Sequence, residues 1–204
     1  LINNLPSTSE LAFGLMLDML RHITVSQRDV QMYKWDYTKF IGRQVKDLKI
    51  GIIGYGRLGK LMYNYCKAFQ AKTSVYDPYI EGYNNIELDE FIKACDVISI
   101  HVHLNGETKK MINRNSLKKS KSGLIIINTS RGGIVDESDI ISLLNENKIG
   151  GYAADVLESE NGEIKHSPLI GEMKTNNKIL ITPHVGGMTI EGQTRAYKWA
   201  INKL

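Results

Sequence analysis

The sequence predicts an α/β fold in which a doubly wound parallel sheet is covered by helices on both faces. From Leu48 onward, short apolar runs typical of buried strands alternate with stretches of helical period. Strands that alternate with helices indicate parallel βαβ units. The run Ile125–Ile127 is apolar at every position, as in strands that are buried on both faces.

The elements follow in chain order. Pro6 to Ser9 offer helix caps, Glu10 stands in the first turn, and apolar residues then recur at helical spacing as far as Ile23. Residues 27–45 have no clear period and predict an irregular surface connection. Strands are predicted over Leu48–Ile53, Thr73–Tyr76, Val97–Val102, Leu124–Asn128, Tyr152–Val156 and Lys178–Thr182, and helices over Leu58–Phe69, Leu88–Ala94 and Asp136–Asn147.

Composition excludes several classes of protein. Of 204 residues, 42% are hydrophobic and 24% charged, which is typical of a globular protein and not of a disordered one. The apolar run Leu11–Leu17 ends at Asp18 and is too short to cross a bilayer, and no signal segment opens the sequence. The net charge of +4 is a modest excess. We therefore expect a cytoplasmic protein without a membrane segment.

Other candidate sites have simpler interpretations. Cys66 and Cys95 have no CxxC spacing and are expected to be buried thiols, and no His, Cys and Asp cluster predicts a metal site. We expect His101 to be a hydrogen-bonded structural residue and His166 to face solvent. A basic stretch without interleaved aromatic residues predicts a solvated helix face and no nucleic-acid surface; it contains Lys109, Lys110, Arg114, Lys118, Lys119 and Lys121.

A glycine-rich turn follows the first predicted strand and opens a helix. Three glycines can simply make a turn, but this context is typical of a dinucleotide site. The first glycine permits the tight turn, the second lets the backbone approach a pyrophosphate, and the third lets the helix pack on the strand. Amides at positions 57 and 58 would face the anion. The motif reads Gly54-Tyr55-Gly56-Arg57-Leu58-Gly59.

Asp77 stands at the end of the second predicted strand, 18 residues after Gly59. A carboxylate there accepts hydrogen bonds from both ribose hydroxyls of an adenosine and repels a 2′-phosphate. Pro78, Tyr79 and Ile80 supply no compensating cation, which favours NAD over NADP. An Asp before Pro is also common in strand-end turns.

Three polar segments follow later strands: Asn128–Gly133, Asp155–Glu160 and Thr182–Gly187. Ligands of open α/β sheets collect at the carboxyl ends of strands. An Arg there can hold a carboxylate, a His can take a hydroxyl proton, and a Glu can orient the imidazole. This set suits the oxidation of a 2-hydroxy acid.

The ordered segments GYGRLG, VYDP, HVHLNGETKKMIN, INTSRGGIVDE, AADVLESE and TPHVGG resemble the D-isomer-specific 2-hydroxy-acid dehydrogenases from about Leu11 to Arg195. The resemblance implies a Rossmann-type domain that binds NAD, with Arg131 on the substrate carboxylate and carbonyl, His184 as acid and base, and Glu160 as its partner. It also implies a set of cofactor contacts, which comprises the glycine motif, Asp77, Pro78, His103, Thr108, Thr129, Ser130, Arg131, Asp155, His184, Gly186 and Gly187. The chain departs from the family at Asn161 and His103, where Pro is usual or frequent.

The resemblance further implies an NAD-dependent oxidoreductase that interconverts a D-2-hydroxy acid and its 2-keto acid, and a homodimer in which the apolar first helix takes part. We expect residues 1–204 to be the NAD-binding domain of a normally two-domain protein, with connecting helices at about 7–25 and 189–204. The sequence begins at Leu1, and we expect an N-terminal substrate domain to lie outside it. Such a chain would bind NAD(H) but turn over poorly.

An alternative function is an NAD(H)-sensing binding module, similar to corepressors of this fold. Arg131, Glu160 and His184 do not separate the two functions, because such corepressors resemble the enzymes at these positions. Turnover of a 2-keto acid with NADH would favour the enzyme.

Overall fold

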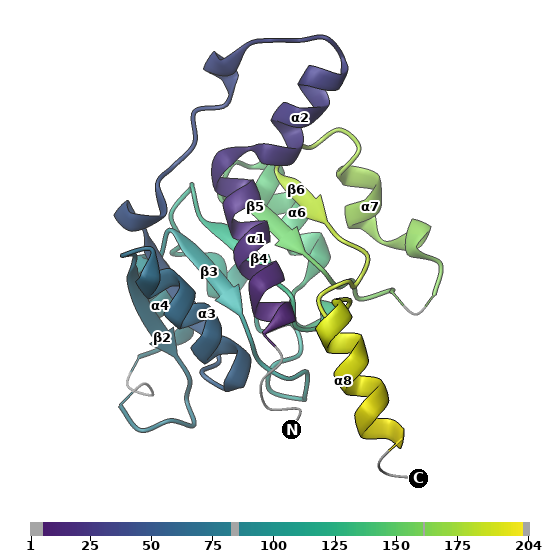
Figure 1. The fold of residues 1–204 in the computed structure, drawn as a ribbon. Coiled ribbons are helices and arrows are strands. Elements are labelled where there is room, and N and C mark those ends of the chain that lie inside the picture. Colours follow the sequence, from purple (N-terminus) through teal and green to yellow (C-terminus); the bar gives the residue numbers. More distant parts are fainter. Residues whose placement is uncertain (1–5, 83–85, 161, 202–204) are drawn as a thin grey trace.

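The computed structural model of the chain describes residues 6–82, 86–160 and 162–201. Its centre is one six-stranded sheet in the order β2-β1-β3-β4-β5-β6, in which all neighbours are parallel (Figure 1). The predicted α/β fold with a doubly wound parallel sheet is confirmed. The strands are β1 (Lys49–Ile53), β2 (Lys72–Tyr76), β3 (Val97–Ile100), β4 (Ile125–Asn128), β5 (Gly151–Ala154) and β6 (Ile179–Ile181).

Helices cover both faces of the sheet. Helices α1 and α3 pack on one face, and α4, α5 and α6 pack on the other. The helices are α1 (Ser7–Arg21), α2 (Ile23–Gln31), α3 (Arg57–Ala68), α4 (Leu88–Ala94), α5 (Arg114–Leu117), α6 (Glu137–Asn145), α7 (Pro168–Glu172) and α8 (Ile190–Ile201).

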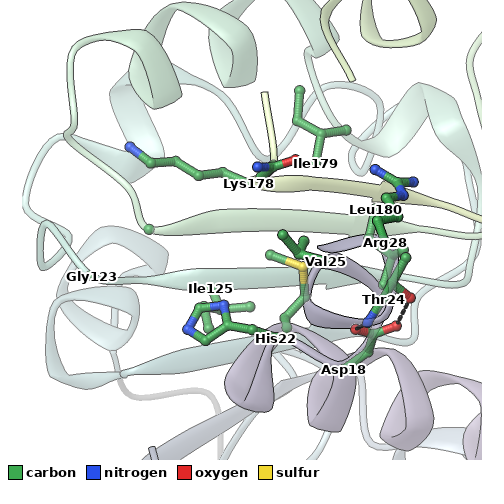
Figure 2. A pocket seen from close by; sticks show the side chains of 13 residues that line it. Asp18, His22, Thr24, Val25, Arg28, Gly123, Ile125, Lys178, Ile179 and Leu180 are labelled. Carbon is green, nitrogen blue, oxygen red and sulfur yellow. Dashed lines mark hydrogen bonds between the residues drawn. The ribbon is translucent and has the colours of Figure 1, made fainter. Parts of the chain in front are cut away.

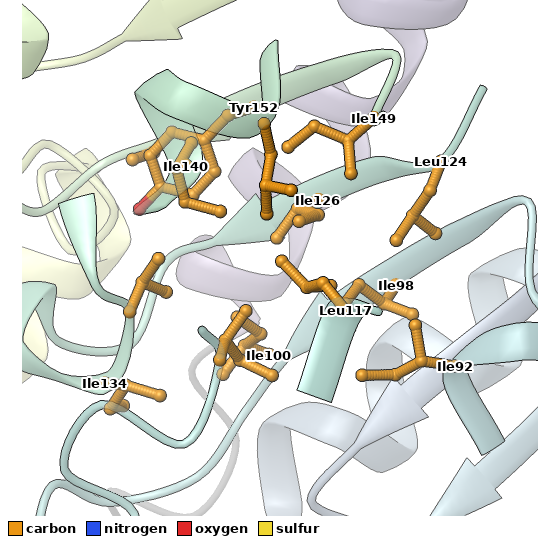
Figure 3. Close-up of a cluster of buried hydrophobic side chains, with 14 of the residues drawn as sticks. Ile92, Ile98, Ile100, Leu117, Leu124, Ile126, Ile134, Ile140, Ile149 and Tyr152 are labelled. Carbon is orange, nitrogen blue, oxygen red and sulfur yellow. The ribbon is translucent and has the colours of Figure 1, made fainter. Parts of the chain in front are cut away.

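The apolar run of β4 supplies both hydrophobic cores. Ile126 faces the α4–α6 side, where it packs in a cluster with Ile98 and Ile140 (Figure 3). Ile127 faces the opposite side and belongs to the cluster under α1 and α3. Both side chains are 0% exposed. A strand that is buried on both faces has no polar position, which is why its sequence shows no alternation.

The strand register brings the segments after each strand to one edge of the sheet. Ile53 of β1 pairs with Tyr76 of β2 on one side and with Ile100 of β3 on the other. The chain therefore leaves β1 between its two neighbours, at the point where the strand order reverses. Ligands of doubly wound sheets bind at such points.

The structure differs from prediction between α1 and β1. Helix α1 ends at Arg21, because His22 takes the left-handed conformation with φ of 56°, so the helix expected at 7–25 is broken. A second helix, α2, begins there, and the Asp18 carboxylate accepts a hydrogen bond from the Thr24 amide at 2.8 Å. Helix α2 thus occupies part of the stretch predicted to be irregular. Beyond it, the chain to β1 contains two short 3-10 turns.

Other elements differ in length. Of the basic stretch, only Arg114–Leu117 is helical. Several of its lysines make ion pairs; Lys110 contacts Asp136 at 3.1 Å and Lys121 contacts Asp96 at 3.0 Å. The second connecting helix, expected at 189–204, is α8, and residues 202–204 lie outside the described residues.

The thiols of Cys66 and Cys95 are free and buried, as predicted. Burial raises the pKa of Cys66 to about 12 and that of Cys95 to about 11. Within the described ranges, none of the helices has the length and apolar character needed to span a bilayer.

Candidate functional site

The three glycines of the turn after β1 differ in what surrounds them. Gly54 has φ of 90°, and a Cβ there would lie 2.6 Å from the His101 carbonyl oxygen. A Cβ on Gly59 would lie 1.9 Å from the Gly54 carbonyl oxygen, so α3 can lie against the turn only without a side chain at this position. A Cβ on Gly56 would meet no described atom within 4 Å. The open side of Gly56 therefore leaves the backbone accessible at the start of α3.

Asp77 holds this turn from the end of β2. Its carboxylate accepts hydrogen bonds from the Tyr55 amide at 2.8 Å and the Tyr79 amide at 3.1 Å. A carboxylate has about four acceptor positions, so Asp77 retains capacity for further donors such as ribose hydroxyls. Pro78 and Tyr79 beside it are exposed.

The residues after β4 form a second part of this edge. Asn128 is the last residue of the strand. Its side-chain NH₂ donates to the Arg131 carbonyl oxygen at 3.0 Å, and its side-chain oxygen accepts from the Ser130 amide at 3.1 Å. The Ser130 hydroxyl donates to the Ile100 carbonyl oxygen at 2.7 Å. The Thr129 hydroxyl is buried and has no hydrogen-bond partner among the described residues. A buried hydroxyl without a partner is costly, and a bound ligand would satisfy it.

These features fit a dinucleotide. Its pyrophosphate matches the open approach at Gly56 and the N-terminus of α3, its ribose matches Asp77, and one of its polar groups matches the Thr129 hydroxyl. The Arg131 side chain is exposed at the same edge, where its guanidinium donates to the Ser130 carbonyl oxygen at 2.6 Å.

Glu160 and His184 come together although 24 residues separate them. The His184 Nδ1 lies 3.1 Å from the Glu160 Oε2, and the side chains are 49% and 23% exposed respectively. Asn128 of β4 pairs with Ala154 of β5, which pairs with Ile181 of β6. Arg131, Glu160 and His184 therefore all follow the carboxyl ends of adjacent strands.

The turn that carries Arg131 also packs directly on the segment before Glu160. A Cβ on Gly132 would lie 2.0 Å from the Leu157 carbonyl carbon, so the two backbones touch. Glu160 and His184 line a cavity of about 410 Å³ whose other walls are mostly apolar; they include Leu157, Ile164, Ile170, Met173 and Ile181.

Asp155, which the resemblance implies as a cofactor contact, follows β5. Its carboxylate accepts hydrogen bonds from residues 182–186, and the residue is 1% exposed. Gly186 is buried against this carboxylate, and Gly187 is exposed.

The loop after β3 holds the remaining predicted residues. His103 is exposed, and its carbonyl oxygen accepts a hydrogen bond from the Thr108 hydroxyl at 2.6 Å. The ring of His101 contacts the Ser99 hydroxyl at 2.9 Å, as expected of a structural histidine, and burial lowers its pKa to about 4. His166 is exposed, as predicted.

A second cavity, of about 140 Å³, lies at the opposite edge of the sheet (Figure 2). It is lined by residues of the α1–α2 junction, such as Asp18 and His22, and by Gly123 and Lys178, which precede β4 and β6. None of the predicted site residues lines it. Within the described part of the chain, no group of three His, Cys, Asp or Glu side chains could hold a metal ion.

Two polar residues at the carboxyl ends of the strands have roles that the sequence did not predict. Asn128 shapes the turn that carries Arg131, and a signal was available, since it is the polar residue that closes an apolar strand. Glu137 is 5% exposed and accepts hydrogen bonds from the Glu158 amide at 2.8 Å and the Ser167 hydroxyl at 2.9 Å. It was hidden as an acidic residue in the first turn of a helix.

Residues 13–186 match the family described as D-isomer specific 2-hydroxyacid dehydrogenase, NAD binding domain. The chain is 35% identical over 196 residues to a hydroxypyruvate reductase of Thermotoga maritima, covering 93% of this chain and 62% of that protein. It is 34% identical over 197 residues to a D-3-phosphoglycerate dehydrogenase of Archaeoglobus fulgidus, covering 93% of this chain and 36% of that protein.

Among solved structures, D-lactate dehydrogenase from Aquifex aeolicus complexed with NAD and lactic acid has a TM-score of 0.87 at 28% identity, covering 96% of this chain and 64% of that one. The chain thus spans between about a third and two thirds of the length of these relatives. The matched family covers most of the chain, and the fold and glycine turn agree with it. The chain therefore belongs to the NAD-binding domains of the D-isomer specific 2-hydroxyacid dehydrogenases.

Proposed function

We propose that the chain belongs to an NAD-dependent oxidoreductase that interconverts a D-2-hydroxy acid and its 2-keto acid, with Arg131, Glu160 and His184 at the reacting centre. The observation that carries the proposal is the 3.1 Å contact between the His184 Nδ1 and the Glu160 carboxylate, at the same sheet edge as the glycine turn.

His184 is proposed as the acid and base. A carboxylate oxygen only accepts hydrogen bonds, so the contact with Glu160 requires the proton on Nδ1. The neutral ring then has Nε2 as its acceptor, and this nitrogen can take the proton of the substrate hydroxyl. In the reverse direction the charged ring returns the proton, and Glu160 stabilises that charge.

Arg131 is proposed to hold the substrate. Its exposed guanidinium can bind a carboxylate through two parallel hydrogen bonds. It also supplies positive charge where negative charge grows on the carbonyl oxygen.

The proposed cofactor site is the edge formed by the glycine turn, Asp77, Thr129 and Ser130. When bound there, NAD supplies the nicotinamide carbon that accepts or gives the hydride. Gly56 and the first turn of α3 would bind the pyrophosphate, and Asp77 would bind the adenosine ribose and reject a 2′-phosphate. His103 and Thr108 shape the loop proposed to flank the adenine.

We further propose a cytoplasmic homodimer. The two buried free thiols suit a reducing compartment. The apolar stripe of α1 packs on the sheet, so support for a dimer comes instead from exposed apolar side chains between residues 23 and 41. Tyr33 and Trp35 are 99% and 86% exposed. Turnover is proposed to need a substrate-binding segment outside these 204 residues.

The test uses the natural full-length protein, NADH and a panel of 2-keto acids, followed by the loss of NADH absorbance. His184→Ala is expected to lower kcat by roughly 10²- to 10⁴-fold and to leave NADH binding largely intact. The matched control is His166→Ala, since His166 is an exposed histidine that is paired with Glu163.

Undiminished turnover in His184→Ala would overturn the assignment. Tight NADH binding by the wild type without turnover of any keto acid would favour the binding-module alternative.

A further inference from the structure

The turn that carries His184 adopts a conformation that few residues take. His184 has φ of 56°, in the left-handed region. The backbone turns tightly here, and the His184 amide donates a hydrogen bond to the Thr182 carbonyl oxygen at 3.0 Å. Such backbone persists only where the surrounding structure holds it.

The Asp155 carboxylate, which follows β5, holds this turn through hydrogen bonds. Its Oδ1 accepts hydrogen bonds from the Thr182 hydroxyl at 2.6 Å and the Val185 amide at 2.9 Å, and its Oδ2 accepts one from the Gly186 amide at 2.7 Å. These donors lie on both sides of His184 in the chain. With 1% exposure, the carboxylate has little solvent to interact with, so these donors satisfy its charge.

The loop that carries Glu160 is held in the same manner. The buried Glu137 carboxylate, on α6, accepts hydrogen bonds from the Glu158 amide and the Ser167 hydroxyl. These two donors lie on opposite sides of Glu160 in the chain. Each member of the Glu160–His184 pair thus stands on a loop fixed by a separate buried carboxylate.

We propose that Asp155 is a positioning residue for His184: its carboxylate fixes residues 182–186 so that the His184 Nδ1 meets Glu160. Glu137 fixes the partner loop. The inference rests on the proposed function for its catalytic meaning, but the positioning itself is a property of the chain without substrate or cofactor.

Both carboxylate oxygens of Asp155 must accept. In Asp155→Asn, one oxygen becomes an NH₂ group, which is a donor. It would then face either the Gly186 amide or the Thr182 hydroxyl and Val185 amide. At least one anchor of the turn is therefore lost although the side chain keeps its size.

The experiment measures the turn directly by NMR on the 204-residue chain. In Asp155→Asn, amide hydrogen exchange at Val185 or Gly186 is expected to accelerate by about tenfold or more, since a lost hydrogen bond to a charged group removes that protection. The ¹H–¹⁵N spectrum of the His184 imidazole is expected to lose the pattern of a ring that is protonated at Nδ1 and hydrogen-bonded.

Two further variants keep the test decisive. Asp96→Asn is the matched control, because Asp96 is also a largely buried carboxylate that accepts a backbone hydrogen bond, from the Lys49 amide at 2.8 Å, and it lies before β3 at the opposite edge. It should leave the exchange at Val185 and Gly186 unchanged. Thr182→Val removes one donor and keeps the carboxylate, so a smaller acceleration is expected, even if Asp155→Asn does not fold.

Unchanged exchange and an unchanged His184 imidazole in Asp155→Asn, or in Thr182→Val if Asp155→Asn does not fold, would overturn the proposal. In the full-length protein, Asp155→Asn should lower kcat by roughly 10- to 100-fold, because the His184 ring is no longer held against Glu160. If the wild type has no turnover, the proposed function fails while the NMR result still decides the positioning role.

Discussion

At the scale of single residues, the glycines of the nucleotide turn separate stability from binding. Gly59 faces the backbone of its own turn, whereas Gly56 faces open space. Steric overlap therefore requires glycine at position 59 for folding. At position 56 no described atom requires it, and a ligand that approaches the backbone there explains it.

Gly59→Ala is expected to lower the free energy of unfolding by roughly 3 kcal/mol, because its Cβ would overlap the Gly54 carbonyl oxygen. Gly56→Ala should change it by less than about 1 kcal/mol, since its φ of −71° suits any residue. Urea denaturation of both variants measures the difference. Equal losses in the two variants would contradict the steric argument.

His101 predicts an acid-sensitive fold. Burial lowers its folded-state pKa to about 4, while the unfolded chain titrates near 6.5. Between these values the unfolded state binds more protons, so stability is full above pH 6.5 and falls as the pH drops toward 4. At pH 5 the loss is about 2 kcal/mol.

Urea denaturation at pH 7.5 and pH 5 checks this in the wild type, in His101→Gln and in His166→Gln. The pH-dependent loss should shrink in His101→Gln and persist in His166→Gln, because His166 is exposed. A loss that is the same in all three proteins would refute the role of His101.

At the scale of elements, burial decides what the sequence could predict. Inner strands such as β3 and β4 could be predicted because both of their faces are covered, so their runs are largely apolar. Helix α2 was missed in part because it buries no residue and most of its residues are polar. Its start depends on His22 and on the Asp18 side chain. The Glu160–His184 pair followed from the family resemblance, but the anchoring roles of Asp155 and Glu137 depend on contacts between distant loops, which no local pattern records.

An isoleucine in the buried strand β4 should contribute far more to the free energy of unfolding than an isoleucine on the surface. Ile126→Ala is expected to cost about 3–4 kcal/mol, because the side chain is 0% exposed and its removal leaves a cavity. Ile190→Ala should cost under about 0.5 kcal/mol, since Ile190 is 83% exposed. Chemical denaturation at neutral pH compares them, and similar costs would mean that the core is misassigned.

At the scale of the whole molecule, large apolar side chains between residues 23 and 41 are exposed, among them Tyr33 and Trp35. Large patches of this kind on soluble proteins mark interaction surfaces. We expect the chain to have the mass of a dimer by light scattering and Trp35→Lys to have that of a monomer, with NADH binding retained in both. A wild type that stays monomeric at high concentration would exclude the dimer.

The central claim is that the glycine turn, Asp77 and Thr129 form an NAD site. Calorimetric titration of the 204-residue chain with NADH tests it most directly, with Gly56→Ala as the matched variant because its fold should be intact. We expect saturable binding at one site per chain, weakened at least about tenfold in Gly56→Ala, where the methyl group would occupy the approach of the pyrophosphate. Absence of saturable binding, or equal affinity in the two proteins, would contradict the claim.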